Sequence, residues 1–256
     1  MTAKTLEEFI YPTQRKLFKQ LCKTYDKQAL VYKGKFILVR GEAPVMLVAH
    51  LDTVHSEPVR DICTSCDGNI LMSPQGIGGD DRCGVYALST VYDLADKKPW
   101  LLFTCDEEIG GRGAEMFCRL HTMKRLPDEL DKLKFIVEID RRGSCDAVYY
   151  DCSNPDFEDY VSSKGFVTAT GSFSDISLVA PELGVAAVNL SSGYYNAHTL
   201  HEYINRAELE ATIEMVCEMV SDAALEDFPA FEFFDAIFDK FFGDYYWEDD
   251  DLFHLK

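Results

Sequence analysis

The stretch PVMLVAHLDTV, residues 44–54, decides the fold class of this chain. Residues 45–49 are all apolar, and an apolar run without alternation is typical of a strand that is buried on both faces. Two further strand-length runs rich in apolar residues follow, WLLFT at 100–104 and LKFIVEI at 133–139. Strands buried on both faces belong to parallel sheets covered by helices on each side, which predicts an α/β fold.

The segments around these strands have the patterns of helices and of a hairpin. Two short apolar runs surround the Lys33-Gly34-Lys35 turn, which is typical of a hairpin. Helical spacing of apolar residues occurs in four segments: 4–24 with a break at Pro12, 80–98, 110–124, and about 203–224. Helices alternating with buried strands predict a three-layer α-β-α sandwich with a mostly parallel mixed sheet.

The chain shows one domain and an unusual C-terminal segment. We find no internal repeat and no Gly/Ser linker, so we expect residues 1–225 to form a single domain. Residues 226–256 hold ten acids against two lysines, a net charge of −8, together with eleven aromatic residues. We expect this segment to be a helix that packs Phe231, Phe234, Phe238 and Phe241 or Phe242 on the core, followed by an acidic tail. The alternative is self-docking or docking to a partner.

Charge and composition exclude several classes of partner. The net charge of −19 disfavours nucleic acid, whose phosphates would be repelled. The sequence has neither the roughly 18 uninterrupted apolar residues of a membrane helix nor a signal peptide, so we expect no membrane association and a cytoplasmic protein. Nine scattered cysteines, an odd number, fit reduced thiols better than a disulfide framework.

Acids and histidines follow the buried strands. The first strand ends in His50-Leu-Asp52, the second in Asp106-Glu107-Glu108, and the third in Glu138-Ile-Asp140. Because the carboxyl ends of parallel strands meet at one edge of a sheet, we expect these side chains to lie close together. Two further stretches supply candidates, Asp80-Asp81 at a predicted helix start and His198 with His201 before the last helix.

Asp80 and Asp81 alone are typical of a helix cap, because acids favour that position. Together with the strand-end residues they have a second interpretation. Burying several acids at one edge is costly without cations, and imidazole with carboxylate is the ligand set of zinc, cobalt or manganese. The combination therefore predicts a site for a pair of divalent ions.

Five motifs in this order resemble those of the co-catalytic di-zinc exopeptidases: VMLVAHLDTV, GIGGDDRCGV, LLFTCDEEIGGRGA, FIVEID and NAHTLHEYI. The resemblance spans about residues 40–215. This superfamily includes leucyl-type and deblocking aminopeptidases, tripeptidases and carboxypeptidase G-like enzymes. The resemblance implies the zinc-exopeptidase (phosphorylase/hydrolase-like) fold and a catalytic metallopeptidase-like domain at 1–225. The gaps between motifs are too short for the lid or dimerisation domain that larger relatives carry.

The resemblance also implies a set of metal ligands. Asp80 would bridge two ions, with Zn²⁺, the metal of the family, as the first candidate and Co²⁺ or Mn²⁺ as alternatives. His50 and Asp140 would complete one coordination shell, and Glu108 and His198 the other. His201 is a second candidate for the position given to His198.

Further roles follow from the same resemblance. Glu107 would be the general base, because neighbouring residues at an extended strand end point in opposite directions and Glu107 is then free of the metal. Asp52 would orient the His50 imidazole. Asp81 would support the bridging acid, with a cis peptide bond between Asp80 and Asp81. Three substrate-binding candidates are Tyr194 or Tyr195, as donors to the oxyanion, and Arg141.

The favoured function is an exopeptidase, an aminopeptidase that acts on short peptides. An amidohydrolase or deacylase acting on N-acyl amino acids or small conjugates is the alternative, because the same site hydrolyses either amide. A catalytically silent binding module is the third hypothesis. The expected partner is a small peptide or an acylated amino acid.

Overall fold

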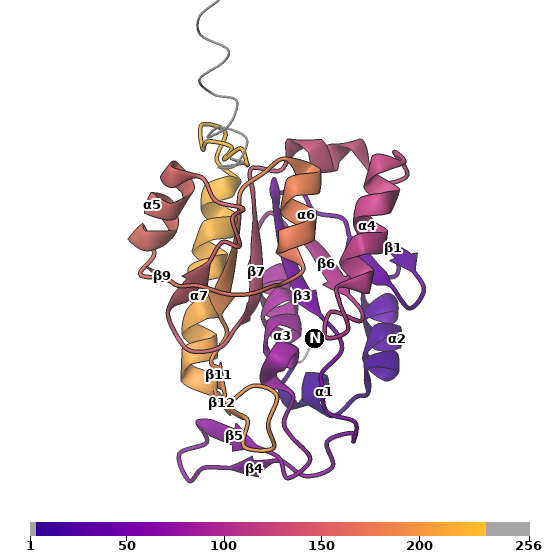
Figure 1. The fold of residues 1–256 in the computed structure, drawn as a ribbon, viewed down its shortest axis with the longest axis vertical. Helices are drawn as coiled ribbons and strands as arrows, with labels where there is room; N and C mark the ends of the chain where they lie inside the picture. The colour runs from indigo at the N-terminus through magenta and orange to yellow at the C-terminus, as the bar shows by residue number, and fades with distance from the viewer. Residues whose placement is uncertain (1–3, 234–256) are drawn as a thin grey trace, which may run out of the picture.

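The computed structural model describes residues 4–233, which form a main sheet of eight strands with helices on both faces (Figure 1). The strands of the main sheet are β1 (Ala29–Tyr32), β2 (Phe36–Val39), β3 (Val45–His50), β6 (Trp100–Thr104), β7 (Phe135–Arg141), β8 (Asp146–Val148), β9 (Val167–Thr168) and β10 (Ala187–Ser191). Their order is β1-β2-β6-β3-β7-β10-β8-β9. The central strands β6, β3, β7 and β10 are parallel, whereas β1, β2 and β8 pair antiparallel with their inner neighbours.

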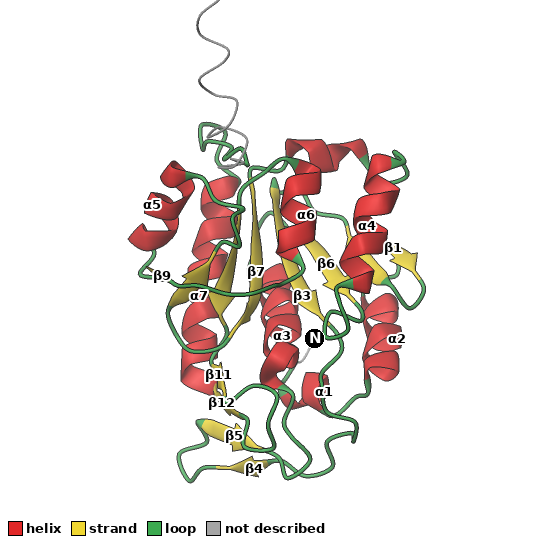
Figure 2. Cartoon of the chain, in the orientation of Figure 1, coloured by secondary structure: helices red, strands yellow, loops and turns green. Residues whose placement is uncertain are grey.

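The helices form the two outer layers, as Figure 2 shows. They are α1 (Glu7–Ile10), α2 (Gln14–Thr24), α3 (Gly79–Leu94), α4 (Arg112–Thr122), the 3₁₀ helix η1 (Asp128–Lys132), α5 (Pro155–Ser163), α6 (Ile176–Leu183) and α7 (Arg206–Ala223). Helices α2, α3 and α7 pack on one face of the sheet, and α4 and α6 pack on the other. The predicted three-layer α-β-α sandwich with a mostly parallel mixed sheet is confirmed.

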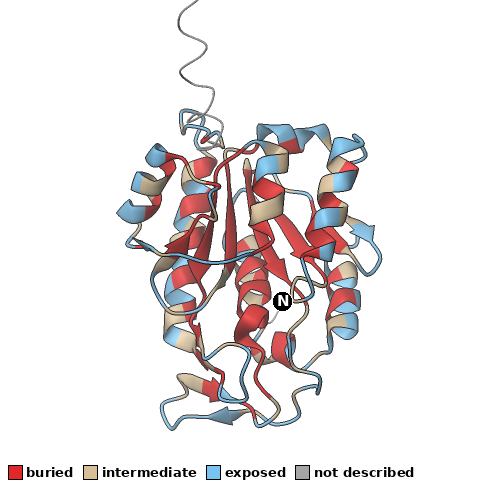
Figure 3. Cartoon of the chain, in the orientation of Figure 1, coloured by how far each residue is buried: buried red, intermediate tan, exposed pale blue. Residues whose placement is uncertain are grey.

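Alternation along β3 explains how one apolar run serves two cores. Val45, Leu47 and Ala49 belong to the core under α3, and Met46 and Val48 belong to the core under α4 and α6. Both sets are fully buried, and Figure 3 shows the same burial along the central strands. Since side chains alternate along a strand, His50 lies on the same face as Met46 and Val48.

A second, smaller sheet lies at the lower end of the molecule in Figure 1, beside the start of α3. Its strands are β4 (Cys63–Thr64), β5 (Ile70–Met72), β11 (Tyr194–Tyr195) and β12 (Tyr203–Asn205), in the order β11-β12-β5-β4. It ties the loop after β3 to the segment before α7. The loop after β3 leads into Asp80 and the segment before α7 contains His198, so the small sheet brings these two motifs together.

Two features differ from the sequence-based expectations. Helices α5 and α6 lie in a stretch for which the apolar spacing predicted no helix. Residues 226–233 form no helix, so the predicted helix is wrong over this part of the C-terminal segment. Phe231 is nevertheless buried as expected, against Phe135 and Phe157. Phe234, Phe238, Phe241 and Phe242 lie outside the described residues.

Within residues 4–233, no helix is both long enough and apolar enough to cross a membrane.

Candidate metal centre

Five elements bring the predicted ligands to the carboxyl-terminal edge of the main sheet. His50 ends β3, Asp140 lies near the end of β7, and Glu108 lies in the loop after β6. Asp80 lies at the start of α3, and His198 lies in the loop between β11 and β12. The structure thus places all five predicted ligands in one cluster, although they are spread over 149 positions of the sequence, from 50 to 198.

Asp80 is at the centre of this cluster. Its Oδ1 lies 3.1 Å from Nε2 of His50, and its Oδ2 lies 3.1 Å from Nε2 of His198. The His50 Nε2 atom is also 3.6 Å from Asp140 Oδ1, and the His198 Nε2 atom is 3.3 Å from Glu108 Oε2. The contacts therefore divide into two groups that share Asp80, the division that the resemblance implies for a bridging carboxylate.

The cluster concentrates negative charge in a largely buried place. Burial, opposed by His50 and reinforced by neighbouring acids, raises the pKa of Asp140 and of Glu107 to about 7 each. Burial would lower the pKa of His50, but Asp140, Asp52 and Asp80 outweigh it and raise that pKa well above 6.5. Among the described residues, Glu108 Oε1 is buried and lacks a hydrogen-bond donor.

These observations fit divalent cations. Imidazole nitrogens and carboxylate oxygens are ligands of zinc-like ions, and a cation would compensate the acids that burial otherwise forces toward the protonated form. His50, Asp80 and Glu108 offer ligand atoms within 4.8 Å of one another, and so do His50, Asp81 and Asp140. The residues present therefore fit a metal site.

Asp81 binds the backbone next to two parts of the cluster. Its Oδ1 accepts a hydrogen bond from the Gly84 backbone N–H at 2.9 Å, and its Oδ2 accepts one from the His50 backbone N–H at 3.1 Å. The peptide bond between Asp80 and Asp81 is cis, as the resemblance implies. Asp81 thus joins the start of α3 to the end of β3.

Asp52 joins His50 to the Glu107–Glu108 turn. Its Oδ1 lies 3.5 Å from His50 Nδ1 and accepts the Glu107 backbone N–H at 3.2 Å, while its Oδ2 accepts the Glu108 N–H at 3.1 Å. The carboxylate therefore lies where it can orient the imidazole, and it also fixes the backbone from which Glu107 and Glu108 extend.

A cavity of about 530 Å³ opens onto the cluster. Asp80, Glu107, Glu108, Asp140 and His198 all line it. Glu107 Oε2 lies 3.9 Å from His50 Nε2, so the predicted base faces both the cluster and the space that a substrate would occupy.

The three substrate-binding candidates have different positions. Tyr194 and Arg141 line the cavity. The Tyr194 hydroxyl donates to the backbone oxygen of Asp140 at 3.1 Å. Tyr195 instead donates to Glu208 Oε2 at 2.6 Å, and it is not among the residues that line the cavity. Pairing with Glu208 therefore directs the Tyr195 hydroxyl elsewhere, and Tyr194 is the better candidate of the two.

His201 also lies away from the cluster. It is exposed, and its backbone accepts a hydrogen bond from the Asn196 side chain and donates one to the Thr199 hydroxyl. His198, in contrast, contacts two acids of the cluster.

Sequence reasoning gave no role to Glu202, which is fully buried beside the cluster. Its Oε1 accepts the Asp80 backbone N–H at 3.0 Å, and its Oε2 accepts the Gly78 N–H at 3.0 Å. The same Oε2 lies 2.8 Å from Nε2 of His55. Glu202 lies four residues after His198 in the stretch HTLHE. The sequence therefore placed this acid near a candidate ligand, but it did not show that Glu202 binds the backbone of Asp80.

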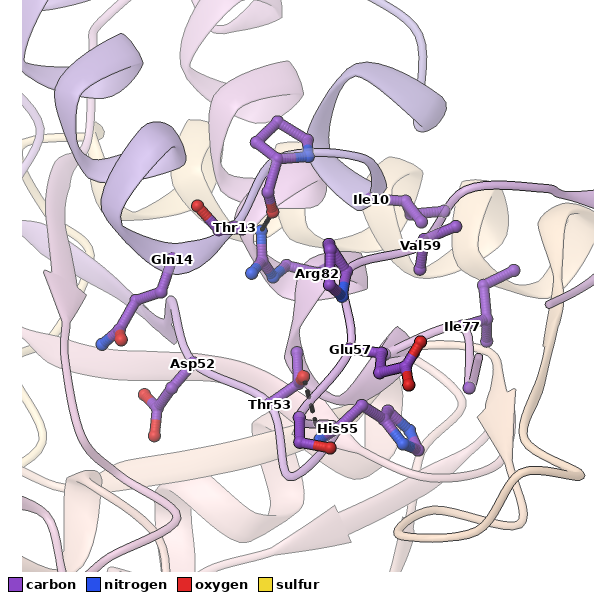
Figure 4. Close-up of a pocket in the computed structure, with 15 residues that line it drawn as sticks. Ile10, Thr13, Gln14, Asp52, Thr53, His55, Glu57, Val59, Ile77 and Arg82 are labelled. Atoms are coloured by element: carbon purple, nitrogen blue, oxygen red, sulfur yellow. Dashed lines mark hydrogen bonds between the residues drawn. The ribbon is translucent and has the colours of Figure 1, made fainter. Parts of the chain in front are cut away.

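The ring of His55 is enclosed by Glu202 and by the backbone of Gly76. It lines a second, smaller cavity of about 180 Å³, which Asp52 and Arg82 also line (Figure 4). Arg82 is buried there and donates to the backbone oxygens of Phe9 and Pro12, which fastens the N-terminal segment to α3. This cavity lies beside Asp52 and does not include the predicted metal ligands.

A further layer of acids lies near the cluster. Ser174 donates a hydrogen bond to Glu138, and Thr104 donates one to Asp175. Burial raises the pKa of Asp175 to about 7 and that of Glu138 well above its usual range. Glu138 belongs to a strand-end motif, whereas no spacing in the sequence pointed to Asp175.

No protein-family model matches this chain, and no curated protein matches it significantly in sequence. Several solved structures, however, are similar to it in fold. A tripeptidase from Staphylococcus aureus superposes with a TM-score of 0.62 at 14% identity, covering 86% of this chain and 97% of that chain. The TET1 peptidase of Pyrococcus horikoshii gives 0.62 at 15% identity, with 86% and 98% covered.

A glutaminyl cyclase from an Acidobacteriales bacterium is also similar, with a TM-score of 0.58 and 16% identity over 86% of this chain and 92% of that chain. At such identities the likeness concerns the fold and not the reaction. The chain therefore has the zinc-exopeptidase-like fold that these peptidases and this cyclase share.

Proposed function

We propose that this protein is a metal-dependent hydrolase of amide bonds, an aminopeptidase that acts on short peptides. The observation that supports this most strongly is the placement of Asp80, whose two oxygens each contact a different histidine at 3.1 Å. His50 and Asp140 would hold one ion with Asp80, and Glu108 and His198 the other. Two such ions, with Zn²⁺ as first candidate, would lower the pKa of a shared water and polarise the scissile carbonyl.

The protein's own residues would carry the proton. Glu107 lines the cavity and is held by the hydrogen bond from its backbone to Asp52. As general base it would take a proton from the attacking water and pass it to the leaving amine. Tyr194 lines the same cavity, and it would donate to the developing oxyanion once its hydroxyl leaves the backbone oxygen of Asp140.

The cavity also suggests the substrate class. Arg141 and Arg142 line it beside the acids, and guanidinium groups bind carboxylates. A short peptide would place its C-terminal carboxylate there while its first amide bond lies at the cluster. The tripeptidase and the TET1 peptidase of the same fold agree with this choice.

The same two arginines favour one alternative, a deacylase acting on N-acyl amino acids, because those substrates also carry a carboxylate. The glutaminyl cyclase shows that the fold serves other reactions as well. A silent binding module is disfavoured, because such a protein has no chemical need for Glu107 in the cavity. We further propose that residues 1–225 act as the catalytic domain.

The test combines metal analysis with a panel of amide substrates. We expect two equivalents of Zn²⁺ per chain by calorimetry and elemental analysis, and hydrolysis of free-amine tripeptides in preference to N-acetylated ones. Amidation of the peptide's C-terminus should raise KM if the arginines bind the carboxylate. Faster hydrolysis of N-acyl amino acids would instead establish the deacylase.

The variant Glu107→Gln should bind the same two equivalents but lose activity by a factor of about 10²–10⁴, the usual contribution of a general base. Glu115→Gln, on α4, removes a carboxylate outside the cluster and serves as the matched control. Undiminished hydrolysis by Glu107→Gln would show that this carboxylate is not the base.

A further inference from the structure

A groove of about 720 Å³ lies outside the proposed catalytic centre, between α2 and the β1–β2 hairpin. Phe18 and Cys22 of α2 line it, together with Val31 of β1 and Cys105 after β6. Val31 is 42% exposed, which leaves an apolar side chain in contact with water at this site. None of the functions proposed above uses this surface.

The rim of the groove is basic. Arg15, Lys19 and Lys23 of α2 and Lys33 of the hairpin line it, and none of these four forms a salt bridge within residues 4–233. The surrounding sequence, 14–40, holds eight Lys or Arg residues and a single acid, Asp26. This is a net charge of +7 in a chain whose total is −19. The groove is therefore a basic region on an acidic protein, and Asp106 is the acid among its lining residues.

Strand β1 borders the groove and is the edge of the main sheet. In the described part of the chain it pairs with β2 alone, so its outer backbone groups face away from any strand. An open edge next to an apolar groove is a common place for an extended segment to bind, because the backbone groups and the side-chain pocket can both be used.

The chain itself contains a segment of the complementary composition. Residues 234–256 hold eight aromatic residues, and their seven acids against two lysines give a net charge of −5. Aromatic side chains suit an apolar groove, and acids suit a basic rim. Both properties of the segment thus match the groove.

The length of the segment also allows it to reach this surface. Twenty-three residues span up to about 75 Å when extended, and a compact domain of some 230 residues is only about 45 Å across. A tethered segment has an effective concentration in the millimolar range, which exceeds that of a second copy in dilute solution. Binding within one chain is therefore favoured over exchange between chains.

We propose that residues 234–256 bind in the groove between α2 and β1 of the same chain, with aromatic side chains on Phe18 and Val31 and acids against Lys19 and Lys33. Cys105 and Asp106, directly before Glu107, also line the groove, so the bound segment would lie against the turn that carries the proposed base.

Trp247 provides a native probe for this proposal. The chain has two tryptophans, and the other, Trp100, is only 4% exposed. Acrylamide quenching of tryptophan fluorescence in the full chain then reports the exposure of Trp247. The contribution of Trp100 is measured in the Trp247→Phe protein and subtracted. In the full chain we expect quenching of Trp247 to be weaker than in a free peptide of residues 234–256.

The charge reversal Lys19→Glu with Lys33→Glu should remove this protection and raise quenching to the value of the free peptide. The matched control is Lys16→Glu with Lys27→Glu, which changes the net charge equally at exposed residues that do not line the groove, and it should retain the protection. Equal quenching in the two double variants would overturn the proposal. So would protection that grows with protein concentration, because the segment would then come from a second copy.

Discussion

At the scale of single residues, the adjacent acids Asp80 and Asp81 make different contacts. The sequence allowed either a helix cap or a metal ligand at this pair, and the structure shows one residue suited to each. Asp81 accepts the N–H of Gly84, three residues on, which is the bond of an N-cap side chain. Asp80 turns its carboxylate to His50 and His198. Both residues depart from helical backbone angles, which separates their two directions.

Glu202 yields a prediction at this scale. Glu202→Gln keeps the shape but replaces one acceptor oxygen with an NH₂ group, which then faces a backbone N–H or His55. A buried donor without an acceptor costs about 1–3 kcal/mol, and disturbed support of a ligand typically weakens metal binding about 10–100-fold. We expect both effects, measured by thermal unfolding of the metal-free protein and by Zn²⁺ titration calorimetry.

Glu208→Gln is the control for this change. Glu208 also accepts a side-chain hydrogen bond, from Tyr195, but it lies outside the cluster. If Glu202→Gln binds Zn²⁺ as tightly as this control, Glu202 does not position Asp80.

At the scale of elements, close packing of α3 on β7 holds the acids in place. Gly84 lies in α3 where a Cβ atom would be 2.3 Å from the Ile139 backbone oxygen and 2.4 Å from Asp81 Oδ1. The helix can therefore approach β7 only because this residue has no side chain. The same approach sets Asp80 beside Asp140.

The variant Gly84→Ala tests this approach. Forcing a methyl group against a strand carbonyl and a carboxylate should destabilise the protein by about 1–3 kcal/mol and weaken Zn²⁺ binding, because α3 must move away from β7. Chemical denaturation and metal titration measure the two effects. Leu94→Ala, at an exposed position of the same helix, should alter neither. Unchanged metal affinity in Gly84→Ala would mean that helix position does not limit the site.

Helices α5 and α6 show why apolar spacing along the sequence did not predict every helix. Helix α5 has a readable start, since Asn154 accepts the Asp156 N–H and Pro155 follows it. Helix α6 is short and contains Pro181, which local rules associate with a helix break. Both helices owe their stability to packing on the sheet, which periodicity within so few residues does not reveal.

At the scale of the whole molecule, the buried acids make the stability of the metal-free protein depend on pH. The pKa values of Asp140, Glu107 and Asp175 are raised to about 7, and hydrogen bonding to Asp80 raises that of His198 to about 9. Each group then binds its proton more tightly in the folded state than in the unfolded chain. Its contribution to stability is present at low pH and is lost as pH rises through the folded-state value.

We therefore expect the melting temperature of the metal-free protein to decrease as pH is raised from about 5 to about 9. Each kcal/mol lost from the free energy of unfolding should lower it by about 2–4 °C. Saturating Zn²⁺ should raise the melting temperature and flatten this slope, because cations stabilise the charged carboxylates. Calorimetry in EDTA and in Zn²⁺ measures both curves. A metal-free melting temperature that rises over this range would contradict the assignment of these shifts.

The sequence by itself determined the layers of the molecule and the identity of the candidate ligands. Continuous apolar runs such as residues 45–49 admit only burial on both faces, and polar residues at the ends of such strands must gather at one edge. These are local properties, set by side-chain chemistry and strand geometry.

The family resemblance implied how the ligands divide into two groups, whereas the tertiary structure alone decided what supports them. That Glu202 holds the Asp80 backbone and that Tyr195 turns to Glu208 depend on contacts that only the folded chain forms. The same is true of the basic groove beside β1. Spacing along the sequence carries no information on such distances, because they are set by how helices and strands pack in three dimensions.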